Sequence, residues 1–153
     1  EENHFNSGVV GTQMTNLAFE ESMKELGISF SRSGVGDRYV SEMMQEKNWL
    51  YGGENSGHIL LKEFHTTGDG IISALQVLKA IKQRQISFDK AVSEINLYPQ
   101  ILLNIPLDKE IDLNTPEIKN SIHEAEKIMN NHGRVLLRKS GTEPLVRIMT
   151  EGK

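Results

Sequence analysis

Short apolar runs and segments of helical periodicity alternate along the first half of the chain. Residues 1–7 are polar, and we expect them to be frayed or a cut edge. Residues 9–10 predict a short strand. Asn16 is a suitable N-cap for a helix over residues 17–26, and Gly27 closes that helix as a C′ glycine.

The same pattern then repeats. Residues 28–30 predict a second strand, and Asp37 is expected to cap a second helix. The apolar stripe of that helix includes Val40 and Met44, and Asn48 is its expected end. An order of strand, helix, strand, helix predicts a parallel α/β layer, in which ligands bind at the carboxyl ends of the strands.

A glycine-rich polar stretch, residues 52–58, separates two apolar runs in the middle of the chain. These runs, residues 49–51 and 59–61, predict two strands that meet at the polar loop. Asp69 is then a suitable N-cap for a segment in which apolar residues recur at helical spacing.

Polar residues 82–85 mark the expected domain boundary. It divides an α/β domain of residues 1–84 from a small domain of residues 85–153. In the second domain, the alternation over residues 101–107 predicts a half-buried strand. Pro106 places that strand at a sheet edge or at a strand end, because proline cannot donate to the ladder.

Ser87 and Thr115 are expected to cap two further helices, the second with Pro116 at its first position. Residues 134–139 and 144–150 predict the two strands of a hairpin. This order of elements predicts an α+β unit with helices on one face of an antiparallel sheet.

Composition and charge exclude several classes of protein. The chain has 153 residues, of which 37% are hydrophobic and 25% charged, as in an ordinary globular protein. A net charge of −4 argues against a general nucleic-acid-binding protein, which needs a basic face. The chain has no cysteine, which fits a reducing cytoplasm, and no apolar run approaches the length of a membrane span. We therefore expect a cytoplasmic protein with no nucleic-acid or membrane partner.

The tip of the predicted hairpin has the groups that bind a phosphate dianion. The guanidinium groups of Arg138 and Arg147 match pairs of phosphate oxygens. The hydroxyls of Ser140 and Thr142, with the backbone N–H groups around Gly141, match the others. Ser-Gly-Thr is also ordinary turn chemistry, so a plain surface hairpin with solvated charges is the alternative.

The loop at residues 52–58 has groups that bind a sugar. The Glu54 carboxylate can accept hydrogen bonds from two neighbouring hydroxyls, and Ser56 and His58 add donors and acceptors beside it. Glycines on both sides allow a tight backbone that a ligand can approach. The alternative is a glycine-rich hairpin in which Glu54 is only solvated.

Together the two loops resemble those of the α-D-phosphohexomutase superfamily. Residues 138–144 read Arg-Lys-Ser-Gly-Thr-Glu-Pro, which resembles its phosphate-binding loop, and residues 52–58 resemble its sugar-binding loop. The form Gly-Glu-Asn-Ser-Gly-His, followed by Thr-Thr-Gly-Asp-Gly at residues 66–70, is most similar to the phosphoglucosamine mutase family. The resemblance covers nearly the whole chain but only the back part of such an enzyme. It implies part of the three-layer third domain followed by the C-terminal fourth domain.

The resemblance implies an isomerase that interconverts glucosamine 6-phosphate and glucosamine 1-phosphate, for amino-sugar and cell-wall precursor synthesis. In that chemistry a phosphoserine donates its phosphoryl group and a glucosamine or glucose 1,6-bisphosphate is the intermediate. A Mg²⁺ ion held by clustered aspartates supports the transfer. Neither the family's Ser-His-Asn context nor an Asp-x-Asp-x-Asp run occurs in this sequence. We expect no catalytic and no metal-binding residue in this chain, and no activity from it alone.

The site residues that the resemblance implies belong mainly to the two loops. Glu143 is expected to orient an arginine or to cap the backbone. The residues expected to bind the sugar are Glu54, Asn55, Ser56 and His58; those expected to bind phosphate are Arg138, Ser140, Gly141, Thr142 and Arg147; Asp37 and Arg38 are candidates for lining the same cleft.

Two alternatives remain open at this point. The chain can derive from a phosphoglucomutase or phosphomannomutase, although such enzymes more often have Met where this chain has Asn55. It can also be a non-catalytic module that binds a phosphosugar. In the favoured interpretation its partners are the N-terminal domains of the same enzyme. Their absence should leave an apolar patch near Val9, Val10 and the first helix, which would favour oligomers.

Overall fold

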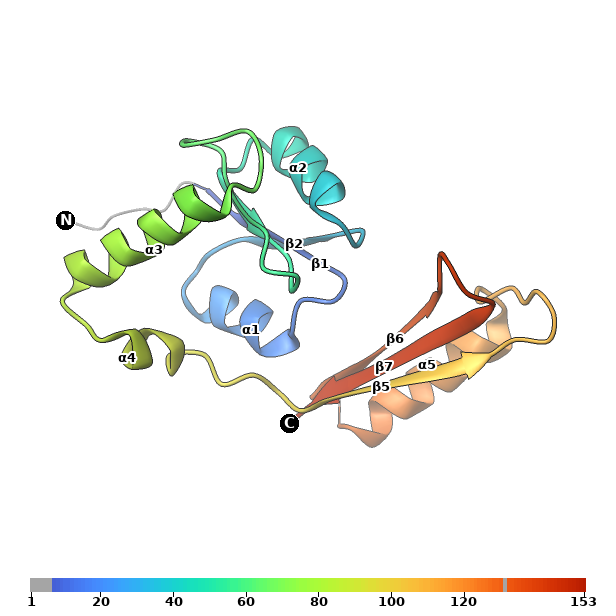
Figure 1. The fold of residues 1–153 in the computed structure, drawn as a ribbon. Coiled ribbons are helices and arrows are strands. Elements are labelled where there is room, and N and C mark those ends of the chain that lie inside the picture. The colour runs from blue at the N-terminus through green and yellow to red at the C-terminus, as the bar shows by residue number, and fades with distance from the viewer. Residues whose placement is uncertain (1–6, 131) are drawn as a thin grey trace. The chain divides into compact units, whose positions relative to one another are not determined.

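The computed structural model describes residues 7–130 and 132–153 (Figure 1). The expectation that residues 1–7 are frayed lies, except for Ser7, outside the described residues. The chain forms two compact units, of which the first ends at Asn96 and the second begins at Leu97.

The first unit contains a mixed sheet of four strands in the order β2-β1-β3-β4. Parallel pairing joins β1 to both β2 and β3, whereas β4 returns antiparallel to β3. Its elements are β1 (Val9–Thr12), α1 (Leu17–Glu25), β2 (Phe30–Ser33), α2 (Asp37–Glu46), β3 (Tyr51–Gly53), β4 (Ile59–Leu61), α3 (Gly70–Arg84) and α4 (Phe88–Val92).

Helices α1 and α2 cover opposite faces of this sheet (Figure 1). On one face Val10 and Leu60 form a buried cluster with Val40 and Met44 of α2. The helix lies so close to β3 that a Cβ at Gly52 would be 2.6 Å from the Met44 sulfur. The predicted three-layer α/β architecture is therefore confirmed.

The order of strands determines where a ligand can bind. The chain passes from β1 to β2 on one side and then crosses to β3 on the other side of β1. In open α/β sheets, ligands bind outside the carboxyl ends of the strands at such a reversal. The loops that follow Thr12, Ser33 and Gly53 meet at that edge.

Several local predictions are confirmed by the helix caps. The side chain of Asn16 accepts from the N–H of Ala18, and Asp69 accepts from two N–H groups at the start of α3. Ser87 caps α4, and Thr115 caps α5 (Pro116–Ile128). These short polar side chains satisfy N–H groups that a helix leaves unpaired at its start.

Two local predictions were wrong. Gly36, and not Asp37, is the N-cap of α2, and Asp37 is its first residue. Gly36 has a φ of 124°, which favours glycine, while the Asp37 carboxylate accepts from the N–H of Arg38 at 2.7 Å. The second strand begins at Phe30 and not at residue 28, because pairing with β1 starts at Phe30.

The second unit is a three-stranded antiparallel sheet in the order β5-β7-β6, with one helix, α5, packed near β6. The predicted boundary after residue 84 would place α4 in this unit. In the structure α4 belongs to the first unit, where Glu94, just after this helix, forms two hydrogen bonds with Arg84 of 2.7 and 2.8 Å. The strands are β5 (Gln100–Pro106), β6 (Gly133–Lys139) and β7 (Leu145–Gly152).

The β6–β7 hairpin is confirmed, and so is the place of Pro106 at the end of an edge strand. The prediction that this edge strand is half-buried was wrong, since every residue of β5 is exposed. Apolar residues do recur at alternate positions of β5, but this strand pairs with β7 along one edge only. Among the described residues, no helix is long and apolar enough to cross a membrane.

Candidate functional site

The loop between β3 and β4 is a tight turn at the carboxyl edge of the first sheet. The N–H of Glu54 donates to the carbonyl of His58 at 3.1 Å, and the N–H of Gly57 donates to the carbonyl of Glu54 at 3.0 Å. Gly57 has a φ of 94°, where a side chain would be strained. The glycine in this loop is therefore required by the backbone.

This turn gathers three of the predicted sugar-binding side chains. Ser56 donates its hydroxyl to Glu54 Oε1 at 2.7 Å, and His58 Nδ1 lies 3.2 Å from the same oxygen. The N–H of Gly36, before α2, donates to Glu54 Oε2 at 3.1 Å. Both carboxylate oxygens are thus fixed, and the Glu54 side chain is only 10% exposed.

The environment keeps Glu54 ionised. The hydroxyl of Ser56 is the main cause that lowers the pKa of Glu54 below its ordinary value. His58 and the Gly36 N–H lower this pKa further, against the opposing effect of burial. A carboxylate held in one orientation and kept charged is suited to accept hydrogen bonds from ligand hydroxyls.

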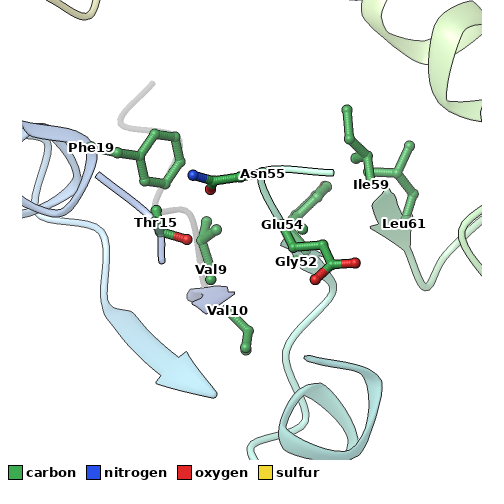
Figure 2. Close-up of a pocket in the computed structure, with 12 residues that line it drawn as sticks. Val9, Val10, Thr15, Phe19, Gly52, Glu54, Asn55, Ile59 and Leu61 are labelled. Atoms are coloured by element: carbon green, nitrogen blue, oxygen red, sulfur yellow. The ribbon is translucent and has the colours of Figure 1, made fainter. Parts of the chain in front are cut away.

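Asn55 is placed differently from its neighbours. Its Nδ2 donates to the carbonyl of Met14 at 2.9 Å, in the turn that follows β1. Figure 2 shows the Asn55 side chain directed toward Thr15 and Phe19, while the Glu54 carboxylate turns away from them. One N–H of the amide therefore braces the loop, and the second N–H and Oδ1 are left for a ligand.

An apolar pocket of about 360 Å³ lies below this loop (Figure 2). It occupies the face of the sheet on which α1 lies, at the place where the sequence predicts an apolar patch. Val10 itself is fully buried. The pocket residues labelled in the figure are Val9, Val10, Thr15, Phe19, Gly52, Glu54, Asn55, Ile59 and Leu61.

Asp37 and Arg38 take other partners. The Arg38 side chain is 82% exposed and donates to Glu42, one turn along α2, at 2.7 Å. This hydrogen bond raises the pKa of Arg38. From this turn, it is the backbone N–H of Gly36 that contacts Glu54.

In the second unit, Arg138 of β6 and Arg147 of β7 are directly opposite each other. The Nε atoms of both side chains are buried and have no hydrogen-bond partner among the described residues. Glu143 approaches Arg147 with a contact of 3.4 Å, which supports its expected role in orienting an arginine. Two like charges side by side are unfavourable unless an anion lies between them.

A third arginine on the same face of the sheet, Arg134, has its charge neutralised by a carboxylate. Arg134 forms an ion pair with Glu151, whose side chain is fully buried. Gln100 donates to the second oxygen of this carboxylate at 3.0 Å. Arg134 therefore has a buried internal counter-charge, and the pair at Arg138 and Arg147 does not.

The hairpin tip adds donors beside the two arginines. The N–H of Ser140 donates to the carbonyl of Leu145 at 2.9 Å. The N–H groups of Gly141 and Glu143 donate to no acceptor in the part of the chain that the structure describes. A Cβ at Gly141 would meet no atom within 4 Å, so packing does not require glycine at this position.

Within residues 7–130 and 132–153, no group of three or more Asp, Glu or His side chains is arranged to hold a metal ion. Among these described residues, the side chains therefore offer no cluster that fits Mg²⁺.

The structure also brings in two residues that the sequence analysis did not assign to the site. Gly36 contributes its N–H to Glu54, and Met14 contributes its carbonyl to Asn55. The glycine-rich turn around Gly36 was a usable signal, since such turns expose N–H groups. A backbone carbonyl leaves no signal in the sequence, so Met14 was not predictable.

Comparison with known families agrees with this division of the chain. Residues 1–98 match the family model described as "Phosphoglucomutase/phosphomannomutase, alpha/beta/alpha domain III". Residues 102–153 match the one described as "Phosphoglucomutase/phosphomannomutase, C-terminal domain".

Over the aligned region, curated relatives are identical to this chain at about half of the positions. It is 54% identical to phosphoglucosamine mutase of Nitrosospira multiformis over 147 residues, which is 95% of this chain and 32% of that protein. It is 52% identical to phosphoglucosamine mutase of Azoarcus sp. over 147 residues, with 95% and 33% covered. The chain thus spans about a third of the length of these relatives.

Solved structures show the same fold. N-acetylphosphoglucosamine mutase of Aspergillus fumigatus matches with a TM-score of 0.82 at 18% identity, over 95% of this chain and 34% of that one. A second structure of that enzyme, in complex with GlcNAc-6P and magnesium, matches with a TM-score of 0.78 at 18% identity, over 95% and 35%.

Proposed function

Because this chain belongs to the phosphoglucomutase/phosphomannomutase family, we propose that it is the substrate-recognition part of a phosphoglucosamine mutase. The proposed reaction of the whole enzyme interconverts glucosamine 6-phosphate and glucosamine 1-phosphate through a 1,6-bisphosphate. The identity of about 50% to phosphoglucosamine mutases supports this choice of sugar. Since the chain spans about a third of those relatives, we expect it to bind substrate and not to turn it over.

In this proposal the β6–β7 hairpin binds the phosphate group that is not being transferred. Arg138 and Arg147 pair with its oxygens, and the N–H groups at Gly141 and Glu143 donate to it. The hydroxyls of Ser140 and Thr142, both near the tip, add further donors.

The β3–β4 loop is proposed to bind the hydroxyls of the sugar. Glu54 accepts from two neighbouring hydroxyls, while Ser56 and His58 hold its carboxylate in place. A bisphosphate must bind in two opposite orientations during the reaction. A contact to the ring, separate from the phosphate site, can serve both orientations.

The observation that carries this proposal is the contrast among three arginines on one face of the sheet. Arg134 has a buried carboxylate partner, whereas Arg138 and Arg147 face each other with buried, unpaired Nε atoms. A plain surface hairpin would have solvated arginines and would not bury these donors, since an unpaired buried donor costs stability. Glu143 contacts only Arg147, at 3.4 Å, so an anion that contacts both guanidinium groups is what the described residues do not supply.

Isothermal calorimetry and NMR titration test the proposal directly. Inorganic phosphate should bind the chain and shift the amide signals of residues 138–147, and glucosamine 6-phosphate should also shift those of residues 54–58. Glucose 6-phosphate and mannose 6-phosphate, measured in competition, test the two sibling activities. If no phosphate compound shifts the hairpin signals, the proposed function is contradicted.

A further inference from the structure

Arg32, in β2, holds the end of β1 and the start of α1 together. Its Nη1 donates to the carbonyl oxygens of Thr12 at 3.1 Å and Thr15 at 2.6 Å. Its Nε donates to Glu20 Oε2 at 2.8 Å, and Nη2 lies 2.7 Å from the same oxygen. The Arg32 side chain is only 18% exposed, and its guanidinium lies 5.4 Å from the ring centre of Phe30. One side chain thus connects β2, α1 and the turn between β1 and α1.

The turn over residues 12–15 uses most of its own polar groups internally. Thr15 donates its N–H to the carbonyl of Thr12 at 3.0 Å, and Thr12 donates its N–H to Thr15 Oγ1 at 2.9 Å. The N–H of Met14 donates to Thr12 Oγ1 at 3.1 Å. The carbonyl of Met14 is directed outward and accepts from Asn55.

We propose that Arg32 is a positioning residue for the sugar loop, defined as residues 54–58. By holding the turn it fixes the Met14 carbonyl, and through Asn55 it fixes the place of the neighbouring Glu54 carboxylate. The hydrogen bonds of this path measure 2.6 to 3.1 Å, and the remaining links are the covalent backbone between adjacent residues. The consequence for sugar binding rests on the proposed function, but the positioning of the loop does not.

An arginine is needed for this task. Its planar guanidinium presents donors in a fixed fork, so it serves the Thr12 and Thr15 carbonyls and the Glu20 carboxylate at once. A lysine at this position keeps the charge but has a single ammonium on a flexible stem. Arg32→Lys therefore separates the geometry of the fork from its charge.

Hydrogen exchange measured by NMR gives the test. The Gly57 N–H donates to the backbone carbonyl of Glu54. In Arg32→Lys this N–H should exchange about fivefold faster, as expected for the loss of about one hydrogen bond. The N–H of Val10, in the buried sheet, is the reference for global unfolding. The matched control is Arg84→Lys, since Arg84 also forms a fork with a carboxylate, that of Glu94. That control should leave the exchange of Gly57 unchanged.

A double-mutant cycle tests the route through Asn55. If the effect of Arg32 travels by this side chain, Arg32→Lys should add little to the exchange of Gly57 once Asn55→Ala is present. Fully additive effects would overturn the route. If Arg32→Lys unfolds the chain, Glu20→Gln is the milder variant, because it removes only the charge of the carboxylate that Arg32 contacts. The ratio of the Gly57 exchange rate to the Val10 exchange rate is then measured in Glu20→Gln.

A ligand titration separates this inference from the proposed function. Arg32→Lys should weaken glucosamine 6-phosphate binding several-fold and leave inorganic phosphate binding unchanged. A wild-type chain that binds neither compound contradicts the proposed function, while the exchange measurement still decides the positioning role. Unchanged Gly57 exchange in Arg32→Lys overturns the inference.

Discussion

Arg138 and Arg147 are direct cross-strand neighbours in the β6–β7 ladder, and the Nε atoms of both are buried without a partner among the described residues. Like charges in this relationship repel each other, and each unpaired buried donor adds a further cost. In the free chain the pair therefore lowers stability. A bound phosphate dianion would compensate for this cost by accepting from both guanidinium groups.

Replacing one of these arginines should separate stability from binding. We expect Arg138→Ala to weaken phosphate binding by about 1.5–3 kcal/mol, the value of a charge-assisted hydrogen bond. The free energy of unfolding without ligand should stay the same or rise, because a repulsion is removed. Calorimetry with inorganic phosphate and urea denaturation measure the two effects.

Arg134→Ala is the matched control on the same face of the sheet. It leaves the buried Glu151 carboxylate without its ion-pair partner. Removing one member of a buried pair costs about 3–5 kcal/mol of stability. The two substitutions should thus have opposite profiles, and a similar loss of stability in both would contradict our account of Arg138.

Gly141→Ala tests whether the tip is open for a ligand. A Cβ at this position meets no atom within 4 Å, and Gly141 is not among the glycines with positive φ. Stability should therefore change by less than about 0.5 kcal/mol. Phosphate binding should weaken by about 1 kcal/mol, because the methyl group restricts access to the backbone N–H groups. Unchanged affinity in calorimetry would show that the backbone at Gly141 does not contact the ligand.

The lowered pKa of Glu54 predicts a specific pH dependence. Its pKa in the folded chain lies below that in the unfolded chain, chiefly because the Ser56 hydroxyl donates to the carboxylate. The resulting stabilisation is fully present above the unfolded-state pKa and is lost as the pH falls through the folded-state pKa. Urea denaturation at a series of acidic pH values should show a smaller loss of stability in Glu54→Gln than in the wild type.

The amide signal of Gly36 reports this titration locally, since its N–H donates to Glu54 Oε2. Glu94→Gln is the control, because Arg84 also lowers the pKa of Glu94. That substitution should reduce the acid sensitivity of the fold without altering the pH at which the Gly36 signal moves. A Gly36 signal that titrates in the ordinary range of glutamate would contradict the lowered pKa.

Asn55→Met should loosen the sugar loop, because methionine cannot donate to the Met14 carbonyl. We expect glucosamine 6-phosphate binding to weaken by about 1 kcal/mol, the value of one hydrogen bond. Inorganic phosphate binding should not change. Asn55→Asp has nearly the same shape but no donor, so an NMR titration should show at least as large a loss. Normal sugar binding by Asn55→Asp would refute the bracing role.

Short-range physics made much of the fold predictable. Asn16, Asp69, Ser87 and Thr115 cap their helices as predicted, because an N-cap depends on a side chain and the N–H groups two or three residues away. The hairpin around Gly141 and the loop around Gly57 follow from polar, glycine-containing stretches between apolar runs.

Contacts between distant segments were not predictable in this way. The sequence suggested Asp37 as a cap, but the glycine before it takes that place and gives its N–H to Glu54, 18 residues away. Alternation in β5 suggested a half-buried strand, yet burial depends on what covers a strand and not on its own pattern.

The sequence by itself determined the order of helices and strands, the two loops and the residue types that suit a sugar and a phosphate. Those features depend on neighbouring residues and on side-chain chemistry. Only the tertiary structure decided that Arg134 has a buried carboxylate partner while Arg138 and Arg147 have buried Nε atoms without one, and that the Asn55 side chain donates to the turn after β1. The physical reason is that pairing and burial depend on which distant groups the fold brings within hydrogen-bond distance.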